Sequence, residues 1–264
     1  MSDWRPSASI EHLKQRAELL AQARAFLAGR DVIEVQIPAL AKDSVTEPDV
    51  QSIEVPGYGY LQTSPEYQMK RLLAAGMPSC YQLGPAFRHG EQGVLHNPEF
   101  TMLEAYWAFA DFEKMAELVE DLVCSLAEKF FGTIQIEHKD EEGEVVRSID
   151  LSRPWKRRPY RELVCEAAGE DWFDLTPDER RGRAEKDFSL EIGADLEDYE
   201  VTQQVFEKLI EEHTFDPCFV THVDSKLIPL AKENPEDASI IDVYELIING
   251  QEISPGYSEL NDPD

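Results

Sequence analysis

Cations, long apolar runs and paired cysteines are what this sequence lacks. Its 25 lysines and arginines are outnumbered by 53 aspartates and glutamates, which gives a net charge of −28 over 264 residues. Such a surface repels polyphosphate at long range and offers no extended basic footprint, so it weakens the case for nucleic-acid binding without excluding it. No apolar run approaches the roughly 18 residues that a membrane span needs, and the start of the chain lacks the apolar core of a signal peptide.

The four cysteines lie far apart in the sequence, at Cys80, Cys124, Cys165 and Cys218. Because they form no CxxC pair, they fit reduced thiols better than a disulfide framework or a zinc site, and we expect a cytoplasmic protein. A chain of this length buries one good core, or at most two small ones. Since no linker-like segment interrupts it, we expect one domain over residues 1–264, with a helical insertion at about 160–213.

Apolar residues at helical spacing predict several helices. They are expected at residues 10–29, from 64 to about 73, at 111–131, from Thr176 onwards and at 201–212. The second begins at Ser64-Pro65-Glu66, where the pattern predicts serine as the N-cap and proline as the first helical residue. Residues 29–40 predict a turn, a strand and a stop at Pro38, and residues 137–147 predict a charged loop or hairpin tip.

Residues 81–108 are the most informative stretch, because they predict two strands joined by a loop, with Arg88 at the end of the first strand. Strand alternation gives each strand one face of interest. These faces carry Gln82, Gly84, Ala86 and Arg88 on the first strand, and Phe100, Met102, Glu104 and Tyr106 on the second. Small residues leading to a guanidinium suit a floor beneath a flat ligand that carries phosphate, since arginine grips phosphate through several hydrogen bonds.

A second chemical pattern surrounds Asn249-Gly250, the strongest two-residue signal for a β-hairpin. Folding there predicts the pairs Ile248–Gln251, Ile247–Glu252 and Glu245–Ser254. Glu245 and Glu252 then share a face, with Cβ atoms within about 7–8 Å. Like charges at that distance repel, and magnesium, which prefers a few carboxylates together with substrate phosphates, would relieve the repulsion. The alternative is two exposed acids on a hairpin of an acidic protein.

Two segments carry a resemblance to a known family. FRHGEQGVLHNPEFTMLEAY resembles motif 2 of the class II aminoacyl-tRNA synthetases, in the form used by lysyl-tRNA synthetases. LQTSPEYQMKRLLAAG is closer to their truncated paralogues, the elongation factor P lysine ligases, which attach a lysine-type amino acid to a protein. The resemblance runs from about Leu13 to Asp264 and implies an α+β fold, an antiparallel sheet flanked by helices. It also implies a homodimer through the motif 1 region, Leu13 to Pro38, and no anticodon-binding barrel before it.

The resemblance also implies ATP and Mg²⁺ as cofactors and assigns roles to individual residues. Arg88 would be the catalytic residue that steadies the α-phosphate. The ATP-binding residues would be Arg88, His96, Asn97, Phe100, Glu245, Glu252 and Ile253, with Glu245 and Glu252 as the metal ligands. The amino-acid substrate would contact Ser64, Pro65, Glu66, Glu104, Tyr106 and Glu259. Arg88 and the two metal ligands are expected to meet around a metal-bound triphosphate.

Four departures from the family pattern keep three functions open. Motif 3 is expected after Asp264 and is missing, Gly90 replaces a glutamate, Leu95 replaces a cation, and Pro255 replaces an asparagine. The first function is an ATP-dependent ligase that activates lysine or a lysine-like amino acid and transfers it to elongation factor P. The second is a lysyl-tRNA synthetase acting on tRNA, and the third is a catalytically impaired, synthetase-like binding protein.

Overall fold

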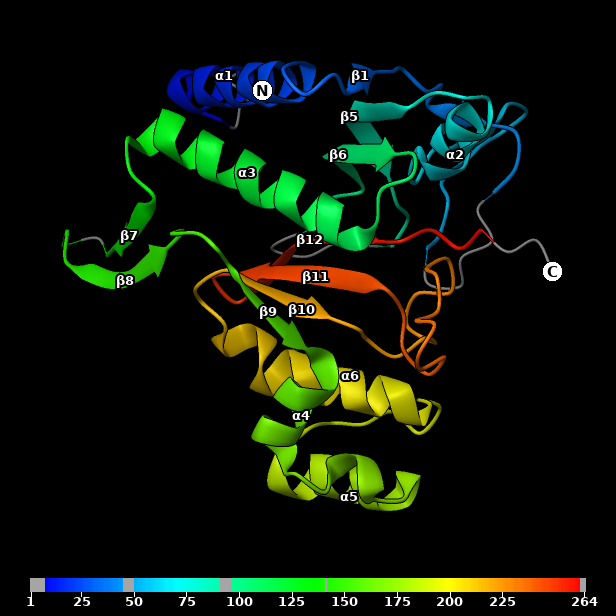
Figure 1. Ribbon diagram of the computed structural model, residues 1–264, viewed down its shortest axis with the longest axis vertical. Coiled ribbons are helices and arrows are strands. Elements are labelled where there is room, and N and C mark those ends of the chain that lie inside the picture. Colours follow the sequence, from blue (N-terminus) through cyan, green and yellow to red (C-terminus); the bar gives the residue numbers. More distant parts are fainter. Residues whose placement is uncertain (1–7, 45–49, 91–95, 141, 262–264) are drawn as a thin grey trace, which may run out of the picture. The chain divides into compact units, whose positions relative to one another are not determined.

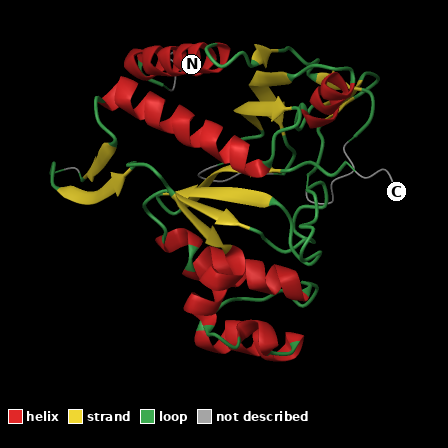
Figure 2. Ribbon diagram, viewed as in Figure 1, coloured by secondary structure: helices red, strands yellow, loops and turns green. Residues whose placement is uncertain are grey.

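The computed structural model describes residues 8–44, 50–90, 96–140 and 142–261. The chain divides into two compact units, Met1–Phe109 and Ala110–Asp264. Both units combine helices with largely antiparallel strands, as Figure 2 shows, and this confirms the predicted α+β class. Within the described residues, no helix is both long and apolar enough to cross a membrane. The single catalytic domain expected from the sequence stays a prediction.

The first unit is built around a long β-hairpin. Its elements are α1 (Ile10–Ala28), β1 (Ile33–Glu34), β2 (Leu40–Ala41), β3 (Glu54–Val55), β4 (Gly59–Leu61), α2 (Glu66–Ala74), β5 (Ser79–Phe87) and β6 (Glu99–Trp107). One sheet has the order β1-β5-β6, with β1 parallel to β5, and a second has the order β2-β4-β3. The helices at 10–29 and at about 64–73 are therefore confirmed, within a residue or two at their ends.

The register of β5 and β6 confirms the predicted faces. Residues directly opposite each other in an antiparallel pair point to the same side of the sheet. Here Gln82 lies opposite Glu104, Gly84 opposite Met102 and Ala86 opposite Phe100. Arg88 follows the last residue of β5, and its backbone N–H donates to Pro98 O at 3.0 Å, which closes the end of the hairpin.

The second unit is a sheet covered by helices on both faces. Its elements are α3 (Phe112–Phe131), β7 (Gln135–Lys139), β8 (Val145–Asp150), β9 (Lys156–Pro159), α4 (Tyr160–Ala168), η1 (Trp172–Asp174), α5 (Pro177–Asp187), α6 (Asp198–Leu209), η2 (Glu211–His213), β10 (Cys218–Thr221), β11 (Val243–Ile248) and β12 (Gln251–Tyr257). The segment 160–213 contains the helices α4, α5 and α6, as expected. α5 begins after Thr176, which forms a capping box with Glu179. The hairpin predicted at 137–147 is formed by β7 and β8.

The second unit has two separate hydrophobic cores, because successive side chains of its central strands point to opposite faces of the sheet. The sheet has the order β12-β11-β10-β9, and all four residues of β10 are buried. Phe219, Tyr244 and Leu246 pack against α3, whereas Val220, Val243 and Ile247 pack against α4 and α6. In Figure 1, α3 accordingly runs along one face of this sheet and α4 and α6 along the other. A strand buried on both faces explains the continuous apolar run Cys218–Val220.

Candidate active site

The start of α2 differs from the predicted helix start by one residue. The helix begins at Glu66 with Pro65 as its N-cap, not at Pro65 with Ser64 as the cap. Ser64 Oγ nevertheless accepts a hydrogen bond from the Glu66 backbone N–H at 3.0 Å. The hydroxyl group of Ser64 also donates to Glu104, with both carboxylate oxygens 3.0 Å away.

Glu104 is a carboxylate enclosed by hydrogen-bond donors on the β5–β6 face. Tyr106, two residues along the same strand, donates its hydroxyl hydrogen to Glu104 Oε1 at 3.0 Å. The pKa of Glu104 is raised to about 7. Burial is the largest cause of this rise, and the charge of Glu66 adds to it. The hydrogen bonds from Ser64 and Tyr106 and the charge of Arg88 act in the opposite direction. Near neutral pH this group therefore exists in both protonation states, and a cation placed beside it would favour the ionised one.

Glu66 is the second acid of this cluster and is only 6% exposed. Its Oε1 lies 2.6 Å from Lys70 Nζ, one helical turn further along α2. A carboxylate this deeply buried remains charged when a cation and hydrogen bonds accompany it. The structure therefore gathers Ser64, Glu66, Glu104 and Tyr106, all predicted as substrate-binding residues, within one part of the first unit.

Arg88 lies at the end of β5 with its guanidinium 5.5 Å from the centre of the Phe100 ring. Its Nε is buried and has no hydrogen-bond acceptor among the described residues, and the same is true of Gln62 Nε2. The Phe87 N–H donates to Gln62 O at 2.9 Å, so the two orphaned donors belong to neighbouring stretches of chain. Buried donors without acceptors are costly, and an anionic ligand with several oxygens is the kind of group that would satisfy them.

The loop between β5 and β6 is described only in part. Gly90 has a φ of 85°, a left-handed conformation that favours glycine and would strain the glutamate that the family pattern has there. His96 and Asn97 are exposed. Glu91 and Leu95 lie outside the described residues.

The hairpin of β11 and β12 turns at Asn249 and Gly250, both at positive φ as predicted. Ile248 pairs with Gln251 and Ile247 with Glu252, which confirms two of the predicted pairs. The predicted pair of Glu245 with Ser254 is wrong, because a β-bulge between Leu246 and Ile247 shifts the register, and Glu245 faces Pro255. The extra residue is Ile253, which is 51% exposed. Bulges of this kind are common next to active sites.

Glu245 and Glu252 influence each other, as expected for neighbours on one face. The pKa of the half-buried Glu245 is raised to about 8, mainly by burial and in addition by the charges of Glu252, Glu211 and Glu207. Glu211 Oε1 also accepts the Glu252 backbone N–H at 3.2 Å. Among the described residues, Glu245 has no cationic partner. The same residues contain no group of three or more side chains that could hold a metal by themselves. Two repelling carboxylates fit a magnesium ion whose remaining ligands are phosphate and water.

Comparisons with known proteins identify the family of this chain. The family model of the class II tRNA synthetases (D, K and N) matches residues 1–264. The chain is a class II tRNA synthetase homologue and belongs to this family. The lysine–tRNA ligases of Staphylococcus epidermidis and Enterococcus faecalis are each 32% identical to it, over 97% of this chain and 51% of their own length. That of Pelotomaculum thermopropionicum is 34% identical, over 96% and 50%.

The synthetase homologue thus spans about half the length of the curated relatives that it matches. Arg88 belongs to its first unit and the two hairpin acids to its second. The expectation that they meet around one triphosphate stays a prediction, and so do the individual roles of the site residues.

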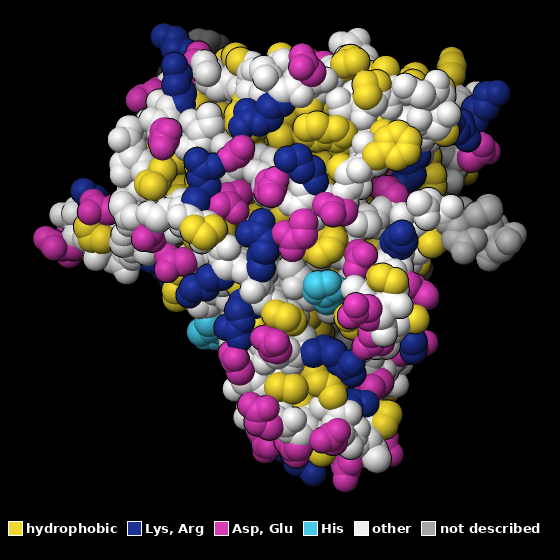
Figure 3. Space-filling view, viewed as in Figure 1, with side chains coloured by type: hydrophobic (Ala, Val, Ile, Leu, Met, Phe, Trp, Pro, Cys, Tyr) yellow, Lys and Arg dark blue, Asp and Glu magenta, His cyan; other side chains and the backbone are white. Residues whose placement is uncertain are grey.

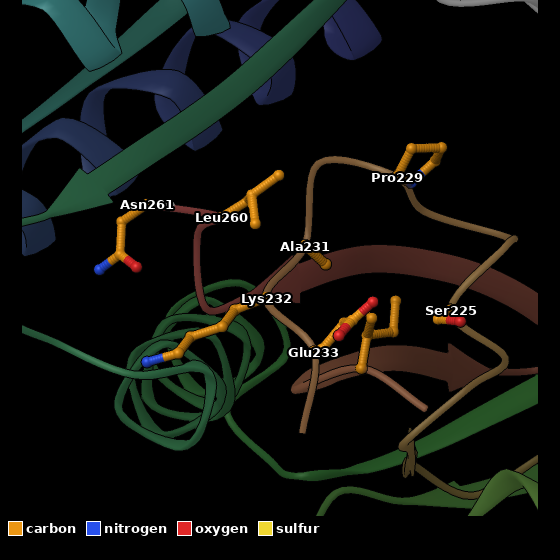
Figure 4. Close-up of a pocket in the computed structure, with 8 residues that line it drawn as sticks. Ser225, Pro229, Ala231, Lys232, Glu233, Leu260 and Asn261 are labelled. Atoms are coloured by element: carbon orange, nitrogen blue, oxygen red, sulfur yellow. The ribbon is translucent and has the colours of Figure 1, made fainter. Parts of the chain in front are cut away.

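Glu259 pairs through its backbone with Ala231, in an antiparallel bridge at the wall of a cavity. This cavity of about 320 Å³ is lined by the loop after β10 and by the segment after β12. In Figure 4, Lys232 and Asn261 extend to one side of Ala231, while Ser225 lies on the other. The acid that the synthetase resemblance assigns to a side-chain ammonium therefore pairs with a residue of the cavity wall.

A short run of cations lies at Arg153, Lys156, Arg157 and Arg158. Three of its arginines form ion pairs with acids of the same unit, which are Arg153–Asp121, Arg157–Glu113 and Arg158–Glu166. Figure 3 shows acidic and basic side chains interleaved over the face that it draws. These three ion pairs offset part of the positive charge of the run within the same unit.

Sequence reasoning missed three residues: Lys70 and Glu211, which contact acids of the two clusters, and Gln62, whose backbone pairs with the residue before Arg88. Lys70 could have been found, because acids and bases four residues apart on a helix are neighbours. Gln62 and Glu211 carry no such spacing pattern, since Gln62 acts through a buried amide and Glu211 contacts a hairpin far away in sequence.

Proposed function

We propose that this chain activates lysine, or a lysine-like amino acid, with ATP to form an aminoacyl-adenylate. The observation that supports this most is the enclosed Glu104, held by Ser64 and Tyr106 beside a second buried acid, Glu66. Two carboxylates near one another suit a substrate with an ammonium group. The names of the relatives, lysine–tRNA ligases, point to the same substrate.

The reaction needs no protein nucleophile. A carboxylate oxygen of the amino acid attacks the α-phosphorus of ATP, the bond from that phosphorus to the oxygen bridging to the β-phosphate breaks, and pyrophosphate leaves with the bonding electrons. Catalysis then consists of positioning and of charge neutralisation. Glu66 would bind the α-ammonium of the amino acid. Glu104, Tyr106 and Glu259 would bind its side-chain end, while Ser64 and Pro65 shape the entry to α2.

We propose nucleotide contacts for residues of the β5–β6 hairpin and, separately, for residues of the β11–β12 hairpin. Arg88 would steady the α-phosphate, consistent with the unsatisfied donor on its guanidinium. Phe100 would stack on adenine, with His96 and Asn97 holding the nucleotide. Glu245 and Glu252 would hold a magnesium ion, and the backbone of Ile253, extra to the ladder, would contact the nucleotide. Bound magnesium would offset the negative charge of the departing pyrophosphate.

The acceptor of the aminoacyl group is proposed to be elongation factor P. The run LQTSPEYQMKRLLAAG and the net charge of −28 favour a protein acceptor over a polyphosphate one. A tRNA acceptor is the second candidate, favoured because the relatives are lysine–tRNA ligases. A homodimer through Leu13 to Pro38 is proposed with either acceptor, since α1 exposes Ile10, Leu13 and Leu19.

Pyrophosphate exchange tests the proposal. The chain is incubated with ATP, labelled pyrophosphate and lysine, β-lysine or ornithine, and the label entering ATP is measured. Exchange with at least one of these amino acids supports adenylate formation. Absence of exchange with all of them refutes it and favours a synthetase-like binding protein. Transfer of labelled amino acid to purified elongation factor P or to tRNA then decides the acceptor.

A further inference from the structure

Lys70 holds one oxygen of a buried acid at the centre of the proposed amino-acid site. Its Nζ lies 2.6 Å from Glu66 Oε1, and the exposed fractions of the two side chains are 27% and 8%. Ion pairs on helix surfaces contribute little to stability, because water screens them and long side chains lose freedom. The Lys70–Glu66 pair differs from such surface pairs, because the Glu66 side chain is buried and the Lys70 side chain is partly buried.

The neighbourhood of Glu66 explains why such a cation is needed. α2 packs against β6 and β5, and the nearest acid on β6, Glu104, is charged in part at neutral pH and repels Glu66. Two cations act on these acids: the charge of Arg88 lowers the pKa of Glu104, whereas Lys70 contacts Glu66 directly. The other titratable groups on these strands near α2, Cys80 and Tyr81, have pKa values raised by burial and do not add charge.

We propose that Lys70 is a positioning residue for the amino-acid substrate: its contact with Glu66 Oε1 holds that carboxylate in place for the substrate ammonium. This rests on the proposed function. In the proposed site Lys70 acts through Glu66, so its removal should affect the binding of the amino acid and leave the chemical step unchanged. Because its ammonium already lies on one oxygen of Glu66, it also limits the directions from which a second ammonium can approach.

Two substitutions at position 70 separate charge from packing. Lys70→Met keeps the length of the apolar stem and removes the charge, whereas Lys70→Arg keeps the charge. In pyrophosphate exchange, Lys70→Met should raise KM for the amino acid about tenfold, a loss of about 1.4 kcal/mol of binding, because Glu66 loses the contact that orients it. KM for ATP and kcat should stay within about twofold, and Lys70→Arg should restore most of the affinity.

The control is Lys114→Met, which removes the exposed pair with Glu117 on α3, 2.9 Å between Nζ and Oε2. It should leave every kinetic constant unchanged. A double-mutant cycle with Glu66→Gln, measured by urea unfolding, tests the pair without any substrate. In that background the effect of Lys70→Met on stability should shrink, because the buried acid is gone.

The outcomes are distinguishable. No exchange by the wild-type chain overturns the proposed function and the role of Lys70 together. Exchange by the wild type with an unchanged amino-acid KM in Lys70→Met overturns the role of Lys70 alone. A fall in kcat with unchanged KM would likewise refute positioning of the amino acid, and so would failure of Lys70→Arg to restore affinity.

Discussion

Replacement of Glu104 by glutamine should make the protein more stable at alkaline pH. Glutamine keeps the shape of the side chain and one oxygen that accepts hydrogen bonds from Ser64 and Tyr106. It removes the negative charge, which burial on the β5–β6 face disfavours. The substitution therefore tests whether this site carries a destabilising ionised group when no ligand is bound.

The size of the effect follows from the shift in the pKa of Glu104. The ordinary value of 4.5 rises to about 7 in the folded protein, so the folded state binds more protons than the unfolded state between these limits. This contribution to stability is fully present below pH 4.5 and is lost as pH rises through 7. At about 1.36 kcal/mol per pH unit, the whole loss is about 3 kcal/mol, of which about 2.5 kcal/mol falls between pH 5 and pH 8.

Urea unfolding of the wild type and Glu104→Gln at pH 5, 6, 7 and 8 measures this directly. The free energy of unfolding of the variant, relative to the wild type, should rise by about 2.5 kcal/mol from pH 5 to pH 8. Glu245 titrates in the same direction, but it is present in both proteins and cancels. Glu99→Gln, at the exposed end of the same strand, is the control. A constant difference across this range would refute the reasoning.

Three further substitutions test other parts of the structure. Arg88→Ala should abolish pyrophosphate exchange yet change the free energy of unfolding by less than about 1 kcal/mol, since its side chain forms no ion pair among the described residues; retained exchange would contradict its assignment. Tyr106→Phe should weaken discrimination between lysine and ornithine in the exchange assay, and unchanged discrimination would remove this hydroxyl from the pocket. Gly256→Ala should cost about 1–3 kcal/mol in urea unfolding, because a Cβ there would overlap the buried ring of Tyr244; a variant as stable as wild type would show that the ring can move.

Alternation made the β5–β6 face predictable from the sequence. Each residue on a strand points to the side opposite its neighbour, so once the strand limits were set, Ala86, Glu104 and Phe100 could lie only on one face. The turn at Asn249-Gly250 was equally predictable, because positive φ at both turn positions restricts the residues that can stand there.

The bulge at Ile253 and the start of α2 could not be predicted in the same way. Isoleucine fits a regular strand as well as a bulge, so nothing in its chemistry marks the extra residue. At α2, the pattern Ser64-Pro65-Glu66 satisfies the rules of a helix start, but the contact between Ser64 and Glu104 depends on a strand 40 residues away. Long-range contacts of this kind decide between local patterns that are equally good by themselves.

The unpaired residue at 253 gives the second hairpin an unusual tolerance. Deletion of Ile253 would leave every cross-strand pair from Val243 to Ile248 unchanged. The residues on either side of it, Glu252 and Ser254, already pair with the neighbouring residues Ile247 and Leu246. Length can therefore vary at this point without turning Tyr257 away from the core that it covers. Removal of Ile253 would thus take away the nucleotide contact proposed for its backbone and leave both hydrophobic cores of the second unit intact.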